Sequence, residues 1–364
     1  MRTELSNGIA INYANEIGFA FMPCIIKVSG SGVTSIELEI SCDGMEFVCA
    51  ADAFKNGCIL DYREYIQSIF DSDSKGNIDY MLDYEFDNLG KTVSFVVHVY
   101  AGDVEKKSFS FESFYVWGAM QFGETWGGYK RLTWFRNFPF SFGLYADAAT
   151  KILIGFNGSP QKYISIAGKG MFNVMAQNFD KEAKYSIIYR YDGEIKQATF
   201  ENVFDLTFYL SAGEQKELLR IDFDDTEEGI YLRWIDRHGF YRYWLFTLGE
   251  QSRDITSEGE FMRNNLFAYS DIVGYMGTFG RNQRYQRKDV LTLCAPSVDS
   301  DTFDMLQDLA SSPVVDMYMG GDANEGEDRW QSVTVKAGSY SKTGATLQDF
   351  ICQLEINNIN IQSL

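Results

Sequence analysis

The chain has 364 residues, enough for two or three domains with sizeable cores. It carries 32 Lys and Arg against 51 Asp and Glu, a formal net charge of −19, which argues against binding nucleic acid or an anionic membrane by bulk attraction. Aromatic residues make up 16% of the chain, with 32 Gly and only 5 Pro, a balance that favours glycine-turned strands over disorder. We find no apolar run of 18 residues, and the N-terminus lacks the basic segment and apolar core of a secretory signal.

The six cysteines do not form a recognisable metal site. None stand in a CxxC pair, and only His98 and His238 could complete a mixed Cys/His set. Buried, reduced thiols are the simpler interpretation, and they indicate folding in a reducing cytosol. We therefore expect no metal and no other cofactor.

Most segments alternate apolar and polar residues with a period of two and break at Gly, Asp or Asn. Residues 34–40, 92–100 and 330–335 are examples, and this pattern is typical of half-buried antiparallel strands. Helical spacing is found over 61–70 and over 299–310, where acidic residues begin the segment and Pro313 follows it. The sequence therefore predicts a mainly β protein.

A weak internal repeat has an offset of 89 residues, and it aligns 100–113 with 189–202. Each copy is predicted to be a strand, a tight turn and a second strand. Strands spaced about ten residues apart over about 90 residues suit a small β-sandwich. We expect tandem β-sandwich domains, the first over 1–115 and the second, together with an aromatic hairpin arm that precedes it, over 116–226. The matched pairs are Tyr100 and Tyr189, Asp103 and Asp192, Glu105 and Glu194, Lys107 and Lys196, Phe111 and Phe200, and Glu112 and Glu201.

An aromatic segment over 114–135 lies between the two predicted sandwiches. It is interpreted as two strands joined by a turn over 123–128, forming a projecting or bridging hairpin arm. Trp117, Trp126 and Trp134 are candidate interface residues because Trp is enriched where subunits meet. The alternative is that their flat faces stack on sugar rings.

The third region, 227–364, is predicted to be an α+β domain with a mostly antiparallel sheet. It opens with a two-sided aromatic hairpin over 230–246, in which Trp234 is expected to be buried. A polar stretch and a basic stretch follow. Strands are then expected at 290–294, 314–319, 332–336 and 347–356, with the 299–310 helix among them.

Catalytic constellations are missing from the sequence. It contains no Gly-x-Ser-x-Gly elbow, no phosphate-binding loop and no dinucleotide-binding glycine motif. A Ser or Cys nucleophile needs a nearby base, usually His, but His98 falls within a predicted strand and His238 in a predicted turn. We expect no enzymatic activity.

Two short runs carry concentrated charge. The acidic run 222–228 includes Asp222, Asp224 and Asp225, and the basic run 281–288 includes Arg281, Arg284 and Arg287. One interpretation is that they form complementary patches on neighbouring copies of the chain. The other is that both are solvated strand edges that prevent sticking.

Several segments resemble uncharacterised structural proteins encoded by phages and prophages of gut Bacteroidales. They are YLRWIDRHGFYRYWLF at 231–246, LTLCAP at 291–296, SPVVDMY at 312–318, KAGSY at 336–340 and LQDF at 347–350, with WGA at 117–119 and TWFRNFPF at 133–140. The resemblance covers most of the chain and brings no catalytic residues with it.

This resemblance implies a virion component, of the tail or baseplate, assembled in the host bacterial cytoplasm. Its expected partners are copies of itself in a symmetric oligomer and other virion proteins, with no nucleic acid and no membrane. The alternative is a carbohydrate-binding adhesin that recognises host surface glycans through exposed tryptophans.

Overall fold

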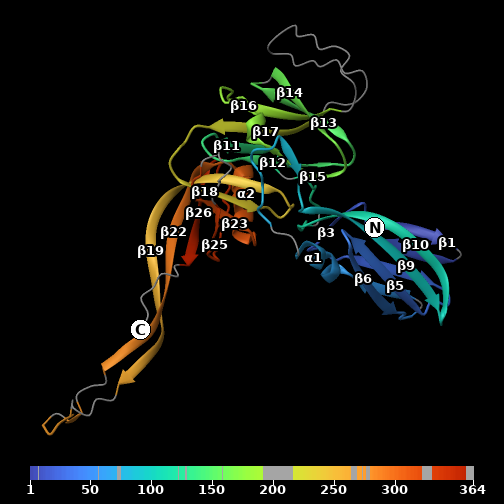
Figure 1. Cartoon of the computed structure of the whole chain (residues 1–364), viewed down its shortest axis with the longest axis horizontal. Coiled ribbons are helices and arrows are strands. Elements are labelled where there is room, and N and C mark those ends of the chain that lie inside the picture. Colours follow the sequence, from blue (N-terminus) through green and yellow to red (C-terminus); the bar gives the residue numbers. More distant parts are fainter. Residues whose placement is uncertain are drawn as a thin grey trace.

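The computed structural model describes residues 1–357, apart from 7, 56, 72–74, 122, 128, 158, 192–215, 264–268, 273, 276–278 and 322–329. It is mainly β, as predicted, with two sandwich-like regions and a third region from which a long hairpin extends (Figure 1). One continuous cluster of buried apolar side chains includes residues of all three regions. The division into 1–115, 116–226 and 227–364 therefore stays a prediction.

The first sandwich packs a four-stranded sheet against a five-stranded one. The four-stranded sheet has the order β1 (Arg2–Ser6), β2 (Ile9–Tyr13), β4 (Ile25–Gly30) and β7 (Gly57–Asp61). The other has the order β3 (Ile17–Phe19), β10 (Val104–Val116), β9 (Gly90–Ala101), β5 (Ser35–Cys42) and β6 (Met45–Asp52). Helix α1 (Arg63–Asp71) follows β7.

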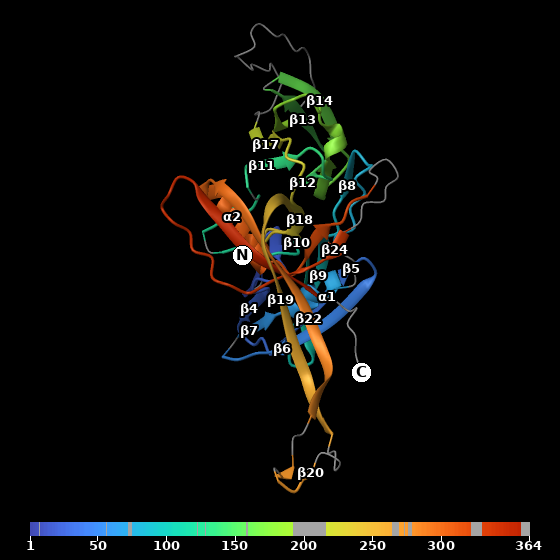
Figure 2. The same ribbon diagram turned by 90° about the vertical axis from the view of Figure 1, so that its left-hand side faces the viewer.

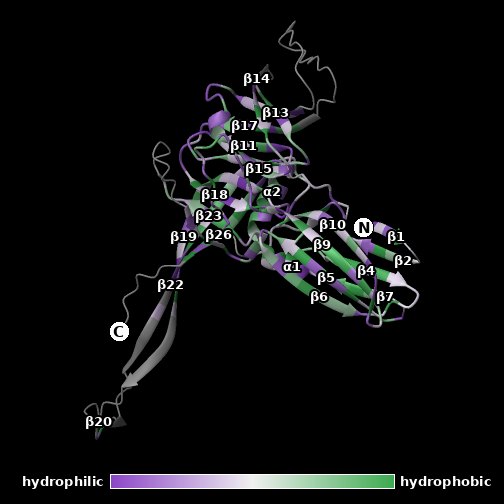
Figure 3. Cartoon of the chain, turned by 45° about the vertical axis from the view of Figure 1, so that its right-hand side comes forward, coloured by the Kyte–Doolittle hydropathy of each residue, from purple (hydrophilic) through white to green (hydrophobic). Residues whose placement is uncertain are grey.

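The predicted alternation is present in this sandwich. In β5, Ile36, Leu38 and Ile40 are buried, and every second residue of β9 from Val93 to Val99 is buried too. The buried apolar side chains of these strands lie on the face toward the opposing sheet. Figure 3 shows the hydrophobic positions along the strands of this sandwich in green. Polar residues between them face water, so the period of two fixes the register.

The second sandwich has a five-stranded and a three-stranded sheet. The larger sheet has the order β11 (Arg131–Phe135), β17 (Lys216–Asp224), β16 (Tyr185–Tyr191), β13 (Thr150–Phe156) and β14 (Ser159–Ile166). The smaller has the order β12 (Ser141–Ala146), β15 (Gly170–Met175) and β8 (Tyr84–Phe86). A 3₁₀ turn, Ala176–Asn178, follows β15. Strand β8 comes from the sequence of the first sandwich but pairs with the second.

The internal repeat is only partly visible. Its first copy is the β9–β10 hairpin. In the second copy Tyr189 lies on β16, but 192–202 lies outside the described residues. Within the described part of the chain, β16 pairs with β17 and β13.

The third region is an antiparallel sheet with one helix. The order is β24 (Trp330–Ser332), β23 (Val315–Tyr318), β18 (Ile230–Ile235), β19 (Tyr241–Arg263), β22 (Phe279–Val298), β26 (Gln348–Asn357) and β25 (Thr334–Val335). Helix α2 (Ser300–Ser311) lies between β22 and β23, and the Asp299 side chain caps it by accepting a 2.8 Å hydrogen bond from the Thr302 N–H. A short pair, β20 (Tyr269–Ser270) and β21 (Gly274–Tyr275), lies between β19 and β22.

The two edges of this sheet meet. The predicted strand 330–335 divides into β24, which pairs with β23, and β25, which pairs with β26. Only Val333 separates them, and its N–H donates to the Val315 carbonyl. In the described residues, the segment 330–335 therefore pairs with both edge strands, and the sheet closes on itself.

The hairpin predicted at 230–246 is confirmed as β18 and the first part of β19, with Ile235 opposite Tyr241. Trp234 is 0% exposed, as expected, and Tyr231 on the opposite face is 1% exposed. Both faces of β18 are buried because one packs within the closed sheet and the other packs against the second sandwich, where Tyr231 donates to the Pro139 carbonyl.

We predict that Trp234→Ala lowers the free energy of unfolding by about 3–5 kcal/mol, because it leaves a large cavity in a site with no exposed surface. Denaturant unfolding measures this. The control is Ile59→Ala, at a side chain 63% exposed, which should change stability by no more than about 0.5 kcal/mol. Equal midpoints for the two variants would contradict the packing described.

Candidate functional site

The segment between α1 and β9 leaves the first sandwich and joins the other two regions. The Gly76 N–H donates to the Tyr241 hydroxyl at 2.9 Å, and the Tyr80 and Tyr243 hydroxyls lie 3.0 Å apart. Further along, β8 adds to the edge of β15. We call residues 75–87 the connecting segment.

Arg233 on β18 is the anchor of the connecting segment. Its side chain is buried, and its Nε lies 3.1 Å from Asp316 Oδ2 on β23. Its Nη1 donates to the Tyr80 hydroxyl at 3.0 Å and its Nη2 donates to the Gly76 carbonyl at 2.5 Å. The Trp330 ring lies 4.1 Å from the guanidinium carbon. A buried charge is tolerable only when paired and hydrogen-bonded, and all of these partners are supplied here.

Glycine is required at position 76. Its φ is +93°, and a Cβ placed there would lie 3.1 Å from both Arg233 Nη2 and Asp316 Oδ2. Any side chain would therefore strain the backbone and press on the buried ion pair.

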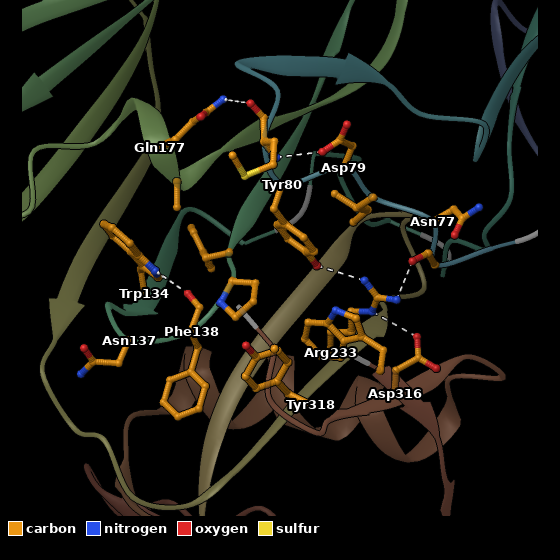
Figure 4. A pocket seen from close by; sticks show the side chains of 18 of the residues that line it. Asn77, Asp79, Tyr80, Trp134, Asn137, Phe138, Gln177, Arg233, Asp316 and Tyr318 are labelled. Atoms are coloured by element: carbon orange, nitrogen blue, oxygen red, sulfur yellow. Dashed lines mark hydrogen bonds and ion pairs between the residues drawn. The ribbon is translucent and has the colours of Figure 1, made fainter. Parts of the chain in front are cut away.

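A cavity of about 1290 Å³ opens beside Arg233 and is lined by all three regions. Figure 4 shows aromatic and planar polar side chains around it, from the connecting segment, from the β11–β12 turn and from β23. The aromatic side chains are Tyr80, Trp134, Phe138, Phe140, Tyr318 and Trp330, and the exposed amides are Asn77, Asn137 and Gln177.

Two carboxyl groups of the connecting segment have raised pKa values. Burial raises the pKa of Glu85, which lines the cavity, to about 7, and Asp79 and Asp87 nearby add to the effect. Burial also raises the pKa of Asp87 to about 6, although its oxygens accept hydrogen bonds from the Leu89 N–H at 2.9 Å and the Asn173 amide at 2.7 Å. Burial thus shifts the pKa of both groups toward the neutral form where this segment meets the second sandwich.

The second candidate site is the extension of β19 and β22, which Figure 2 shows leaving the body of the molecule as a narrow hairpin. Beyond the base, where β19 pairs with β18 and β22 pairs with β26, the described residues 255–263 and 279–287 pair only with each other as strands. We call these two stretches the arm. Salt bridges at its base join Arg253 to Asp289 at 3.1 Å and Lys288 to Glu355 at 2.8 Å.

The predicted hairpin arm over 114–135 is wrong. Strand β10 pairs with β9 and, in parallel, with β3, whereas β11 pairs in parallel with β17. Each aromatic half pairs with strands of its own sandwich, which buries side chains that a free hairpin would expose.

The residues between these strands pack against the β18–β19 turn. The Ala119 N–H donates to the Arg237 carbonyl at 2.7 Å, and Trp126 Nε1 donates to the His238 carbonyl at 3.0 Å. The Tyr129 hydroxyl donates to Asp308 on α2 at 2.9 Å. The described part of this segment is thus a connection that holds the regions together.

Two of the three candidate tryptophans are buried and the third is half-buried. Trp117 and Trp134 are 8% and 3% exposed, so neither offers a face to a sugar ring. Trp126 is half-buried, and its ring packs against Tyr145 and stacks on Phe240. The glycan alternative required exposed faces, and the burial of Trp117 and Trp134 removes both as platforms. Trp134 alone of the three lines the cavity.

The acidic run 222–228 is largely paired within the chain. Asp222 accepts hydrogen bonds from Arg131 at 2.5 Å and Arg220 at 3.0 Å, and Asp225 accepts two from Arg136 at 2.6 and 2.5 Å. Asp224 accepts from the Thr226 N–H at 2.8 Å.

The basic run lies on the arm. Arg287 donates to Asp289 at 2.9 and 2.8 Å, whereas the side chains of Arg281 and Arg284 lie outside the described part of the structure. Among the described side chains, Asp222 and Asp225 pair with arginines outside the basic run and Arg287 pairs with Asp289, so no ion pair joins the two runs there.

Other sequence features have structural roles. His98 lies 3.2 Å from Glu105 on a sandwich surface, and His238 lies 3.5 Å from Glu124. All six cysteines are free, and all but Cys294 are buried.

Within the described ranges, no group of three His, Cys, Asp or Glu residues could hold a metal ion. No helix of the described part is long and apolar enough to span a membrane.

The sequence matches no protein-family model and no curated protein. Among solved structures, the periplasmic chaperone SfaE is 12% identical, with 60% of this chain and all of that chain covered and a TM-score of 0.21. A 1.5-MDa bacterial ice-binding adhesin is 10% identical, with 93% and 92% covered and a TM-score of 0.16. With TM-scores this low, neither likeness carries an argument about this chain.

We predict that Arg233→Met lowers the free energy of unfolding by about 3–5 kcal/mol, because Asp316 is left buried without its partner. The matched control is Arg253→Met, which removes an exposed pair with Asp289 and should cost less than about 1 kcal/mol. Denaturant unfolding compares the two, and an equal loss would contradict the role assigned to Arg233.

Asp87 should make stability depend on pH. Because its pKa is higher in the folded chain, the folded state holds the proton more tightly, and the resulting stabilisation is present below about pH 4 and lost as the pH rises through about 6. Asp87→Asn, which stays neutral, should lack this loss. Urea unfolding of both proteins between pH 4 and 7 measures the difference in unfolding free energy. A difference independent of pH would contradict the prediction.

Proposed function

We propose that the chain is a structural subunit that assembles with further copies of itself through the arm. The arm carries this proposal. From Ile255 to Arg263 it extends roughly 27 Å at the usual rise of a strand. An isolated two-stranded hairpin is marginally stable in water, so a projection of this length is expected to gain a partner in its working state.

The backbone of the arm offers edges to a partner. In the described residues, its strands pair with each other and with no third strand. Unpaired edges accept an additional strand from another chain, and main-chain hydrogen bonds then supply affinity. The apolar side chains Leu248 and Ile255 are 45% and 58% exposed on the base and arm, where a second surface could cover them.

Charge favours another copy of the same chain as the partner. The basic run 281–288 lies on the arm, while the whole chain has a net charge of −19. The basic run occupies one strand of the arm, whereas the paired strand carries Glu258 and Glu260, so it is this one strand that is attracted to the acidic body of a neighbouring copy. Contacts from the arm of one copy to a different surface of the next are heterologous, which is the type that builds rings.

The setting proposed for this assembly is a phage particle. The resemblance of 231–246 and of the later C-terminal segments to virion proteins supports a part of the tail or baseplate. The arrangement of β-rich regions around a connecting segment suits a building block of this kind, and the proposal assigns no catalytic role to any residue.

We predict that the intact chain forms oligomers and that an arm-shortened variant is a monomer of lower mass. The variant replaces 256–286 with Asn-Gly, a two-residue turn that joins the paired positions Ile255 and Arg287. Light scattering after gel filtration measures mass, and far-UV circular dichroism with thermal unfolding checks that the body remains folded. A folded variant that keeps the oligomer mass would overturn the role of the arm.

Charge reversal tests the same contact with the arm intact. Arg281→Glu combined with Arg284→Glu should slow association at low salt, because rim charges mainly set the encounter rate. The difference from the unaltered chain should vanish near 1 M salt, where the screening length falls to about 3 Å. Stopped-flow light scattering measures the rates, and equal rates at low salt would argue against a charge-guided contact.

A further inference from the structure

The cavity beside Arg233 points to a ligand site separate from the arm. We infer that it binds a neutral oligosaccharide, held between aromatic faces and planar amide side chains. The inference goes beyond assembly, and it uses residues other than the three tryptophans singled out from the sequence.

Aromatic side chains form a continuous wall in the cavity. Phe138 and Tyr318 have ring centroids 5.9 Å apart, Tyr318 and Trp330 are 5.2 Å apart, and Trp330 stacks with Tyr80 at 6.3 Å. All four are partly exposed rather than buried. The C–H face of a pyranose ring is apolar and flat enough to pack on such rings by dispersion and burial.

Planar polar groups stand around this wall. Asn77, Asn137 and Gln177 are exposed amides from three different parts of the chain, and an amide can both donate to and accept from a hydroxyl group. Gln177 Nε2 already donates to the Met81 carbonyl at 2.7 Å, which fixes the direction of the side chain. Apolar walls with a few oriented polar groups are typical of ligand sites.

The charges in the cavity favour a neutral ligand. Four cations line it, and three of them already have partners: Arg233 holds Asp316, Arg136 holds Asp225, and Lys75 donates to the Phe70 carbonyl at 2.8 Å. An anionic ligand would compete with carboxylates at two of these. Neutral hydroxyl groups would not.

The cavity is large enough for more than one sugar ring. Its volume of about 1290 Å³ exceeds the range of roughly 300–1000 Å³ usual for small-molecule sites. An oligosaccharide of a few rings, with its edges toward the amides, fits both the size and the mixed lining.

The test uses the full chain and a panel of neutral oligosaccharides with two to six pyranose units, including glucans, mannans and N-acetylglucosamine oligomers. Binding is measured on an array and then by tryptophan fluorescence titration. We expect at least one member to bind. Tyr318→Ala and Gln177→Ala should each weaken that binding about tenfold or more, a loss of about 1.4 kcal/mol.

Tyr163→Ala is the matched control, because Tyr163 is an exposed tyrosine on β14 away from the cavity, 55% exposed. It should leave binding unchanged. Gln177→Ala keeps the test valid if Tyr318→Ala fails to fold, since Gln177 is exposed. No binding by any member of the panel, or binding that neither cavity variant weakens, would overturn the inference.

Two further comparisons distinguish this cavity from an anion-binding site and from the arm. Anionic oligosaccharides, such as galacturonate oligomers, should bind more weakly than the best neutral ligand, and the reverse order would also overturn the inference. The arm-shortened variant should bind the same ligand as the intact chain. Failure of the arm proposal and failure of the cavity proposal are therefore distinguishable.

Discussion

The buried guanidinium of Arg233 connects parts of the molecule that are far apart in sequence. It pairs with Asp316 in its own sheet, and it donates hydrogen bonds to the Gly76 carbonyl and the Tyr80 hydroxyl of the connecting segment. The same segment then adds β8 to the second sandwich. Because a desolvated cation needs all of its partners, the three regions cannot separate at this point without a large cost in free energy.

This constraint has consequences on both sides of β18. On one side the connecting segment, the β11–β12 turn and β23 surround the cavity (Figure 4). On the other side lie Trp234 and the closed sheet, whose long strands β19 and β22 continue into the arm. The base of the arm is therefore anchored by the same packing that shapes the cavity.

Much of the fold could be predicted from local pattern. Alternation indicates β5 and β9, acidic residues before the helix indicate the N-cap Asp299, and the two-sided aromatic strand indicates the burial of Trp234. These features depend on neighbours in sequence or on the contrast between apolar and polar faces, which a single sequence displays directly.

The features that sequence does not reveal depend on distant partners. Strand β19 shows no alternation where it leaves the body, because 249–256 is exposed on both faces, so the pattern indicates only a polar and a basic stretch. The aromatic run 114–135 has strand-like halves, but their partners, β9 and β17, lie elsewhere in the chain. The cavity is lined by residues between 75 and 330 in the sequence, which only the folded chain brings together. A single sequence also does not show that Arg233 pairs with Asp316 on a later strand.

The central claim is that the arm of one copy contacts the body of another. A photo-crosslinking amino acid at Ile255, which is 58% exposed on the arm, tests it directly. On illumination of an equal mixture of ¹⁵N-labelled and unlabelled chains, the account predicts crosslinked peptides that join labelled to unlabelled copies. Mass spectrometry that found crosslinks only within single chains, under conditions where the intact protein is oligomeric, would contradict it.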